Sequence, residues 1–324
     1  MTAQDTDILY FDGTNWSMYF DASDVGILTS GQSMNSFHIV DADTILISFT
    51  DPITLGTQAV EPVDIVQFDA TSLGDTTAGT FSMYFDGSDV GLEDAINEEI
   101  DALDVLPDGR LLISTLANST LPGLNGADED LLAFTPTALG ENTSGTWAMY
   151  FDGSKAGVGL GNSAEDIDAL DVAANGDIYL SAADGFAVSG ISGNDEDVFV
   201  CTPAFVGGAV DSCTYTSVLY FDGSAWGLDA NDMEAINLPF GFASSHSPLW
   251  RSAACLSLSS IAKSKIRRWR GRLSSKADRI PASRTARTAW IRISKAHRRP
   301  RTLAQTLPLL REKTIIKPAE LPAA

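Results

Sequence analysis

A short phrase that recurs four times constrains the fold of this chain more than any other feature. It reads Met-Tyr-Phe-Asp-Gly-Ser at 149–154, and close copies stand at 18–23, 83–88 and 219–224. The starts of successive copies are 65, 66 and 70 residues apart. A fixed period of this kind indicates a repeat architecture, in which each unit is one supersecondary motif. The interpretation divides residues 1–238 into three full units (18–82, 83–148 and 149–218) and two partial units (1–17 and 219–238).

Each repeat contains the same blocks of strand-forming sequence. Between two copies of the phrase, for example, the blocks lie at 100–105, 110–114 and 130–134, and the phrase itself is the fourth. The first two blocks are joined through Asp-Gly or Asn-Gly, which favour two-residue hairpins because Gly supplies the positive φ that the turn needs. The runs are rich in β-branched and aromatic residues and bounded by Gly, Asn, Asp and Pro, as is typical of strands.

Four short strands per unit, mostly antiparallel and linked by hairpins, predict an all-β fold of tandem four-stranded repeats resembling a β-propeller. A chain of small β-sandwiches or a β-solenoid is the structural alternative. The N-terminal segment 7–23 supplies only the last two blocks, and the segment 232–238 supplies the first block again. Two partial blades could close a ring from both ends, although the same pattern also fits a fragment of a longer array.

The charge of the chain is divided between two regions. Positions 1–240 hold two basic side chains, Arg110 and Lys155, against 40 acidic ones, a net charge of −38, whereas the remaining 84 residues carry +16. An acidic body repels phosphates and anionic lipid headgroups, so residues 1–238 are expected to bind no nucleic acid. Cations suit it better, and simple solubilisation is the alternative explanation of its charge. No run of 18 apolar residues predicts a membrane span.

The repeat pattern stops after Leu238, in the middle of an expected hairpin, and residues 239–324 turn basic. Three interpretations compete for this tail. It is a nucleic-acid or anionic-surface binder, with Ile266, Trp269 and Leu273 on one face of an amphipathic helix; or it folds back on the acidic body; or it results from a change of reading frame near Leu238. The abrupt loss of pattern with a reversal of charge favours the third, so the tail is expected to be disordered or out of frame.

The acidic turn before the third block is the sharpest candidate for a binding site. Hard cations such as Ca²⁺ take six to eight oxygen ligands, and a Gly-bent loop offers several carboxylates at once. The match is not an EF-hand, which needs a twelve-residue loop closed by Glu, and the first full unit departs from it with Glu61-Pro-Val-Asp64. The predicted calcium ligands are Asp5, Asp7, Asp128, Glu129, Asp130, Asp195, Glu196 and Asp197.

The first block adds two Asp residues per copy, at 101 and 104 and again at 168 and 171. Strand alternation is expected to bring some of them near the same acidic turn. The alternative is that all of these acids solvate loops and protect strand edges from pairing with other chains.

Enzymatic chemistry has little support in the sequence. Of the three histidines, His246 and His297 lie in the tail, and His38 stands where other first blocks have Asp. Ser-His-Asp catalysis and zinc ligation both need groupings that do not occur, so no catalytic residue is predicted. Paired carboxylates keep a polysaccharide hydrolase open as the alternative. Their repetition in several units argues for a structural role, because a single active site needs unique residues.

Cys201 and Cys213 flank the loop between the third and fourth blocks of one unit only. Two strands of a hairpin lie close enough for a disulfide, and such a bond would indicate an oxidising compartment. A pair of buried thiols is the alternative.

The repeat resembles tandem modules of large bacterial exported or surface-attached proteins. The resemblance covers about residues 5–238 and is carried by 83–92, 99–103, 108–115, 126–136 and 145–147. It implies a propeller-like architecture and an extracellular or cell-surface location, and it brings no catalytic residue with it. The first seven residues lack the basic and apolar regions of a secretory signal. That absence argues for a cytoplasmic protein, unless an upstream segment precedes a chain that begins inside a repeat.

Together these observations predict a non-enzymatic extracellular or surface repeat scaffold. Its expected partner is an unidentified protein or glycan, and calcium is its candidate cofactor.

Overall fold

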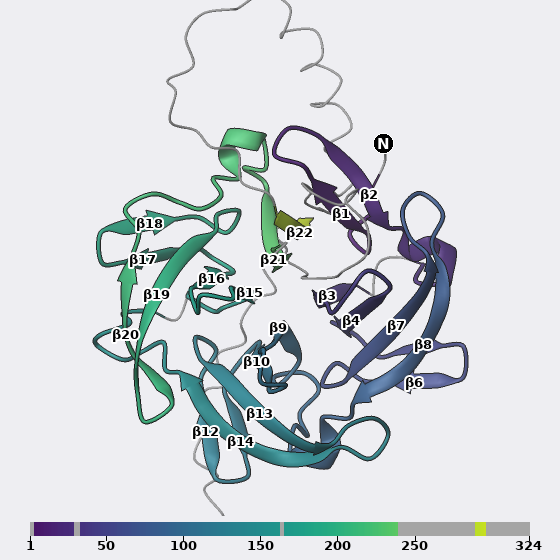
Figure 1. Ribbon diagram of the computed structural model, residues 1–324, viewed down its shortest axis with the longest axis horizontal. Coiled ribbons are helices and arrows are strands. Elements are labelled where there is room, and N and C mark those ends of the chain that lie inside the picture. Colours follow the sequence, from purple (N-terminus) through teal and green to yellow (C-terminus); the bar gives the residue numbers. More distant parts are fainter. Residues whose placement is uncertain (1–2, 29–32, 163–164, 239–288, 296–324) are drawn as a thin grey trace, which may run out of the picture.

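The computed structural model describes residues 3–28, 33–162 and 165–238, together with the backbone of 289–295. Its main strands form four units of four strands arranged around a common axis, as Figure 1 shows. Two of these units are joined into one eight-stranded sheet by a parallel bridge between Phe151 and Val210. The prediction of an all-β, propeller-like repeat fold is confirmed, and each unit is called a blade below.

Three blades are built from contiguous chain. Each runs from the inner to the outer strand in sequence order, and all neighbouring strands within a blade are antiparallel. The first blade contains β3 (Met34–Ile39), β4 (Thr44–Phe49), β7 (Ile65–Ser72) and β8 (Ala78–Phe85). The second contains β9 (Ile100–Val105), β10 (Leu111–Thr115), β13 (Leu131–Ala138) and β14 (Ser144–Phe151). The third contains β15 (Ala169–Val172), β16 (Ile178–Ser181), β19 (Phe199–Val206) and β20 (Ala209–Tyr215).

Short additional hairpins lie between the second and third strands of these blades. They are β5 (Ile53–Leu55) with β6 (Gln58–Val60), β11 (Ser119–Leu121) with β12 (Leu124–Gly126), and β17 (Phe186–Val188) with β18 (Ile191–Gly193). Short 3-10 turns follow copies of the recurring phrase: η1 (Ala22–Val25), η2 (Ser88–Val90) and η3 (Ser224–Trp226). Within the described residues, no helix has the length and apolar character needed to cross a membrane.

The fourth blade is a composite of both ends of the described chain. Its strands, from the axis outward, are β21 (Asn231–Asn237), β22 (Ala289–Lys295), β1 (Ile8–Phe11) and β2 (Trp16–Phe20). The strand β22 pairs with β21 on one side and with β1 on the other. It occupies the place that the second block fills in the other blades.

This placement gives a structure to one segment of the predicted basic tail. The backbone of 289–295 is a paired strand, whereas the sequence led us to expect no ordered structure there. The amphipathic stretch 266–273, His246 and His297 lie outside the described residues.

The recurring phrase forms the C-terminal end of three outer strands, β2, β8 and β14, and the turn that follows each of them. Its Phe residue is fully buried at Phe20, Phe85 and Phe151. Phe20 and Phe85 also bridge in parallel to Gly74 and Gly140 of the following blade. The phrase therefore joins neighbouring blades as well as completing its own, which explains its regular spacing.

The fourth copy of the phrase behaves differently. It lies beyond the end of β20, and only Phe221 makes a bridge, to Val198. The copy at 219–224 thus pairs with the third blade only at Phe221, next to the start of β19, and then leads into the composite blade.

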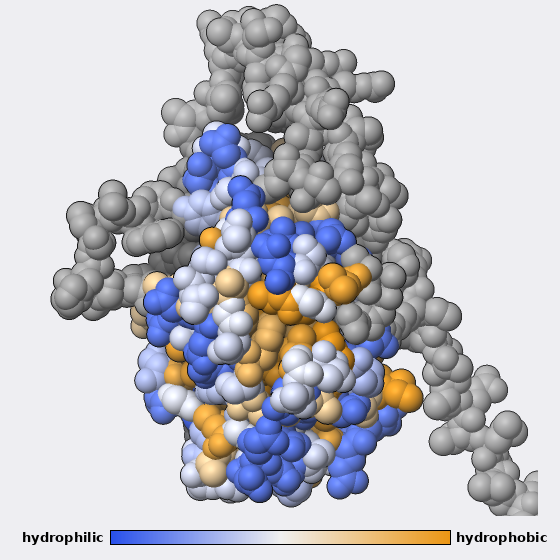
Figure 2. Space-filling model, turned by 90° about the vertical axis from the view of Figure 1, so that its right-hand side faces the viewer, coloured by the Kyte–Doolittle hydropathy of each residue, from blue (hydrophilic) through white to orange (hydrophobic). Residues whose placement is uncertain are grey.

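Apolar side chains from neighbouring blades form the core between the sheets. One cluster, for example, joins Phe20, Phe37 and Phe68, and another joins Phe85 and Phe134. The side of the molecule that carries β7 and β8 shows hydrophobic side chains gathered in its middle with hydrophilic ones around them (Figure 2). The acidic charge of the body thus leaves some apolar surface on the outside of the ring.

Candidate functional site

The four inner strands β3, β9, β15 and β21 neighbour one another around the axis. They carry two sets of polar residues that correspond in the four blades. The first axial ring consists of Asn35, Asp101, Asp168 and Glu234, and the second axial ring consists of His38, Asp104, Asp171 and Asn237.

A β-bulge explains how both rings occur on one strand although their positions differ by three residues. In β9, Ile100 pairs with Thr115 and Ala102 pairs with Ser114, so Asp101 is the extra residue of a bulge. The register of β21 shifts in the same way around Glu234. Regular alternation would place residues three apart on opposite faces, and a bulge re-aims the side chain. The sequence pattern alone did not reveal this irregularity.

The first axial ring is deeply buried and acidic. Asp101 and Asp168 are only 4% and 6% exposed. Neither Asp101 nor Asp168 has a hydrogen-bond partner on either carboxylate oxygen. Buried polar groups in native proteins nearly always have partners, so both residues are exceptional.

Neighbouring acids surround these two residues. Burial raises the pKa of Asp101 well above its usual range, and the charges of Asp166 and Glu99 raise it further. Burial also raises the pKa of Asp168, followed by the charges of Asp232 and Asp166. We define the axial acid cluster as the set of carboxyl groups linked in this way: Glu99, Asp101, Asp166, Asp168, Asp232 and Glu234.

The second axial ring is also buried, but hydrogen-bond donors reach its acids. Asp104 Oδ1 lies 2.7 Å from His38 Nδ1, and Asp104 Oδ2 accepts a 2.8 Å hydrogen bond from the backbone N–H of Val172. Asp171 Oδ1 accepts hydrogen bonds from the Asn237 side chain at 2.8 Å and from a backbone N–H at 3.1 Å. These bonds run from blade to blade and hold the ring of strands together.

The acid that opens the third block has the same structural role in all four blades. In the second blade, Asp130 Oδ2 accepts from the N–H of Ala127 and Oδ1 accepts from the N–H of Gly153, both at 2.9 Å. A Cβ atom at Gly153 would collide with the carbonyl oxygen of Glu129, so this copy of the phrase needs glycine here. The copy at 18–23 has Ala22 at the same position, and its N–H still donates to Asp7. We call this pair of bonds the latch, and its acids are Asp7, Asp64, Asp130 and Asp197.

Three of the eight predicted calcium ligands, Asp7, Asp130 and Asp197, are therefore latch residues whose two carboxylate oxygens both have backbone donors. Burial raises the pKa of Asp7 to about 6, against the effect of its two backbone hydrogen bonds. Asp5 lies nearby in the turn before β1, and its charge adds to this shift.

The other predicted ligands lie in two equivalent turns. The Glu129 carboxyl group is hydrogen-bonded to Asp128, and burial together with this bond raises the pKa of Glu129 to about 7. Glu196 and Asp195 form the same pair, with the pKa of Glu196 raised to about 7 by the same causes. The charge of Asp128 also raises the pKa of Asp101. As the sequence led us to expect, an acid of the first block lies near the acidic turn.

The described residues contain no group of three acidic, histidine or cysteine side chains in the arrangement of a formed metal site. Calcium at the acidic turns accordingly stays a prediction. What the structure adds is that the turns lie next to the axial acid cluster, whose carboxyl groups come from three different blades.

The two basic side chains of the acidic body lie elsewhere. Arg110 Nη2 contacts Asp108 Oδ2 at 2.9 Å, and Lys155 Nζ contacts Asp211 Oδ1 at 2.8 Å. Both partners are exposed residues, so neither cation neutralises the axial acid cluster.

Cys201 and Cys213 form a disulfide across β19 and β20. Of the two alternatives left open by the sequence, the structure therefore has the bonded pair.

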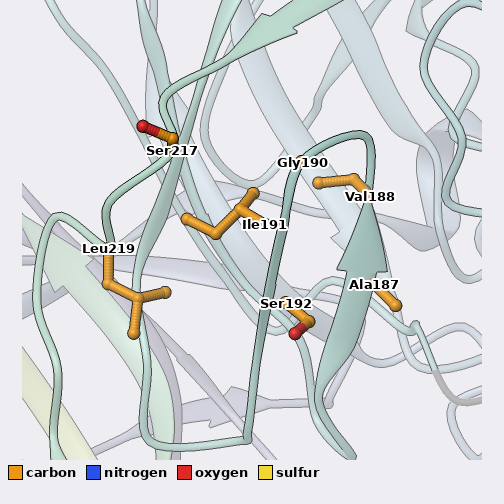
Figure 3. A pocket seen from close by; sticks show the side chains of 7 residues that line it. All are labelled: Ala187, Val188, Gly190, Ile191, Ser192, Ser217 and Leu219. Atoms are coloured by element: carbon orange, nitrogen blue, oxygen red, sulfur yellow. The ribbon is translucent and has the colours of Figure 1, made fainter.

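A hollow of about 500 Å³ lies beside the hairpin of β17 and β18 (Figure 3). Its side chains include Val188, Ile191 and Leu219, with the hydroxyl groups of Ser192 and Ser217. None of its lining residues titrates, so it offers a contact surface and no acid–base chemistry.

Comparisons with known proteins do not assign this chain to a family. No family model matches it, and no curated protein does. Among solved structures, a protein from Lactobacillus plantarum aligns at 12% identity over 72% of each chain, with a TM-score of 0.31. The extracellular domain of a putative one-component system from B. thetaiotaomicron aligns at 10% identity over 72% of this chain and 33% of its own, with a TM-score of 0.27. At these scores neither alignment bears on function.

Proposed function

We propose that this chain is a non-enzymatic, extracellular or cell-surface scaffold that presents the outer surfaces of its blades to a protein or glycan partner. The observation that carries this proposal is the role of the recurring acids. In each blade the latch acid binds two backbone N–H groups, and one of them belongs to the fifth residue of a copy of the recurring phrase. Residues that repeat for this reason maintain architecture and leave the exposed loops to vary.

The disulfide supports the proposed location. Disulfides form and persist mainly in oxidising compartments such as the cell exterior, and Cys201 is fully buried beside its partner strand. The dense surface carboxylates of the body suit a protein that must stay soluble outside the cell.

One observation favours the rival, a carboxylate-dependent polysaccharide hydrolase. The pKa of both Glu129 and Glu196 is raised to about 7, a range in which a carboxyl group acts as a general acid. These residues are equivalent members of two blades. The hydrolase hypothesis requires that one of them be catalytic and that the other be its structural copy.

A panel of bacterial and host polysaccharides separates the two proposals. Reducing-end release and binding are measured in parallel for the unchanged protein and for Glu129→Gln and Glu196→Gln. The scaffold proposal predicts no release by any of the three proteins. Release that disappears in one variant while its melting temperature is unchanged would establish the hydrolase and overturn the scaffold.

A further inference from the structure

We propose that the axial acid cluster binds a hard divalent cation of the Ca²⁺ type, with Asp101, Asp168 and Asp232 as its ligands from three blades. This site lies on the inner strands and differs from the acidic turns that the sequence singled out. The proposal rests on the geometry of the axis and not on the scaffold role.

Asp101 provides the first argument. It is a bulge residue, only 4% exposed, and neither of its carboxylate oxygens accepts a hydrogen bond from another residue. Leaving a buried charged group without a partner costs several kcal/mol. A bulge that directs such a side chain inward is a costly arrangement unless something binds there.

The charged groups around Asp101 and Asp168 are all negative. The groups that act on Asp101 are Asp166, Glu99 and Asp128, and all of them are acids. Those that act on Asp168 are again acids, with Asp232 first among them. Because Arg110 and Lys155 are paired with exposed acids, neither basic side chain of the body compensates this charge.

The proposed ligands are all carboxylates, and they come from three different blades. Asp168 and Asp232 come from neighbouring blades, and the charge of Asp232 acts on Asp168 more strongly than any other charge does. Asp101 comes from a third blade and interacts with Asp168 through their charges. Carboxylate oxygens are the ligands that Ca²⁺ prefers, and its coordination geometry is flexible. The described residues hold no ready-made group of three ligands. The proposal therefore requires that Asp101, Asp168 and Asp232 rotate about their side-chain torsions to meet on one ion.

The competing explanation is that the cluster holds protons in place of a cation. Raised pKa values fit that state, since two carboxyl groups in contact share one proton. The two explanations predict opposite responses to calcium, and both predict that the metal-free protein gains stability when one acid is neutralised.

The test uses the full chain, freed of metal with EDTA and dialysed at pH 7.5 in 150 mM NaCl. Calcium is titrated by calorimetry and melting is followed with and without Ca²⁺. The variants are Asp101→Asn and Asp168→Asn. The matched control is Asp171→Asn, which removes a similarly buried carboxylate from the second axial ring.

We expect calcium to bind the unchanged protein and Asp171→Asn and to raise the melting temperature of both. Both first-ring variants should bind at least about tenfold more weakly, with metal-free melting temperatures at or above that of the unchanged protein. The absence of heat and of any melting shift in the unchanged protein would overturn the proposal. An equal calcium response in Asp101→Asn and Asp168→Asn would also overturn it, because the ion would then bind at the surface.

Discussion

The two axial rings come from the same four inner segments of the chain, yet their buried carboxylates differ in hydrogen bonding. In the second ring, each acid has a donor on a neighbouring strand: the His38 ring nitrogen lies against Asp104, and Asn237 donates to Asp171. In the first ring, Asp101 has no donor from another residue. Equal burial therefore leaves each acid of the second ring with at least one hydrogen-bond donor or His38 contact, whereas it leaves Asp101 with none. The difference lies in which residue the neighbouring blade supplies.

The strand β21 supplies one residue to each ring, and it is held in the composite blade by pairing with β22. Removing residues 239–324 should have the largest effect, because the pairing edges of β21 and β1 would both be left open. We expect loss of the cooperative melting transition, followed by circular dichroism. As a control, 173–181 fused after Leu238 should restore a second strand and the transition. Unchanged melting of the truncated chain would show that β22 is dispensable.

The second ring should be the more costly one to break. Asp104→Ala removes the acceptor of the Val172 N–H and the partner of His38, and we expect a loss of about 3 to 5 kcal/mol in the free energy of unfolding. Urea denaturation measures it. The control is Asp108→Ala, an exposed acid paired with Arg110, for which less than about 1 kcal/mol is expected. Equal losses for the two variants would remove the structural role of the second ring.

Loss of the disulfide should lower the stability of the protein without changing the structure of either axial ring. The bond between Cys201 and Cys213 has a sequence separation of 12 residues, and a loop of this size contributes about 3 kcal/mol. Cys201→Ser with Cys213→Ser should therefore melt at a lower temperature and keep the full calcium response. If the response disappears as well, the rings and the outer strands are coupled and the two must be treated as one unit.

The latch provides a third set of acids, buried but fully hydrogen-bonded. Burial raises the pKa of Asp64 to about 6, and the charges of Asp86 and Glu61 contribute in the same direction. A carboxyl group with a raised folded-state pKa binds its proton more tightly when folded. Its stabilising contribution is present below about pH 4 and is lost as the pH rises through 6.

Unfolding free energies between pH 4 and 7.5 check this contribution. Asp64→Asn should flatten the pH dependence by up to about 3 kcal/mol, while the exposed control Asp69→Asn should leave it unchanged. An unaltered slope in Asp64→Asn would mean that this carboxyl group ionises normally in the folded protein.

The sequence predicted the blades because their local signals agree. Gly109 and Gly176 have the positive φ that their hairpins require, and strands form on both sides of each. The period of the phrase predicted the period of the ring, although its fourth copy lies beyond the end of β20 and pairs only through Phe221. The second strand of the composite blade could not be predicted, since 289–295 shares no recognisable block with the repeats and pairs over a long sequence separation.

The candidate site was only partly visible in the sequence. The contiguous acids of the turns predicted calcium ligands, yet Asp130 and Asp197 in these turns accept hydrogen bonds from backbone N–H groups. Asp101 and Asp104 looked equivalent, because a bulge leaves no mark in a single sequence. The signal that distinguishes them is the ring composition: His38 and Asn237 accompany the acids of the second ring.

Native mass spectrometry of the full chain, sprayed from calcium-containing solution at pH 7.5, tests the difference between the rings most directly. Our account predicts one Ca²⁺ retained per chain in the unchanged protein and in Asp171→Asn, and none in Asp101→Asn. A metal-free mass for the unchanged protein, or one retained ion in Asp101→Asn, would contradict it.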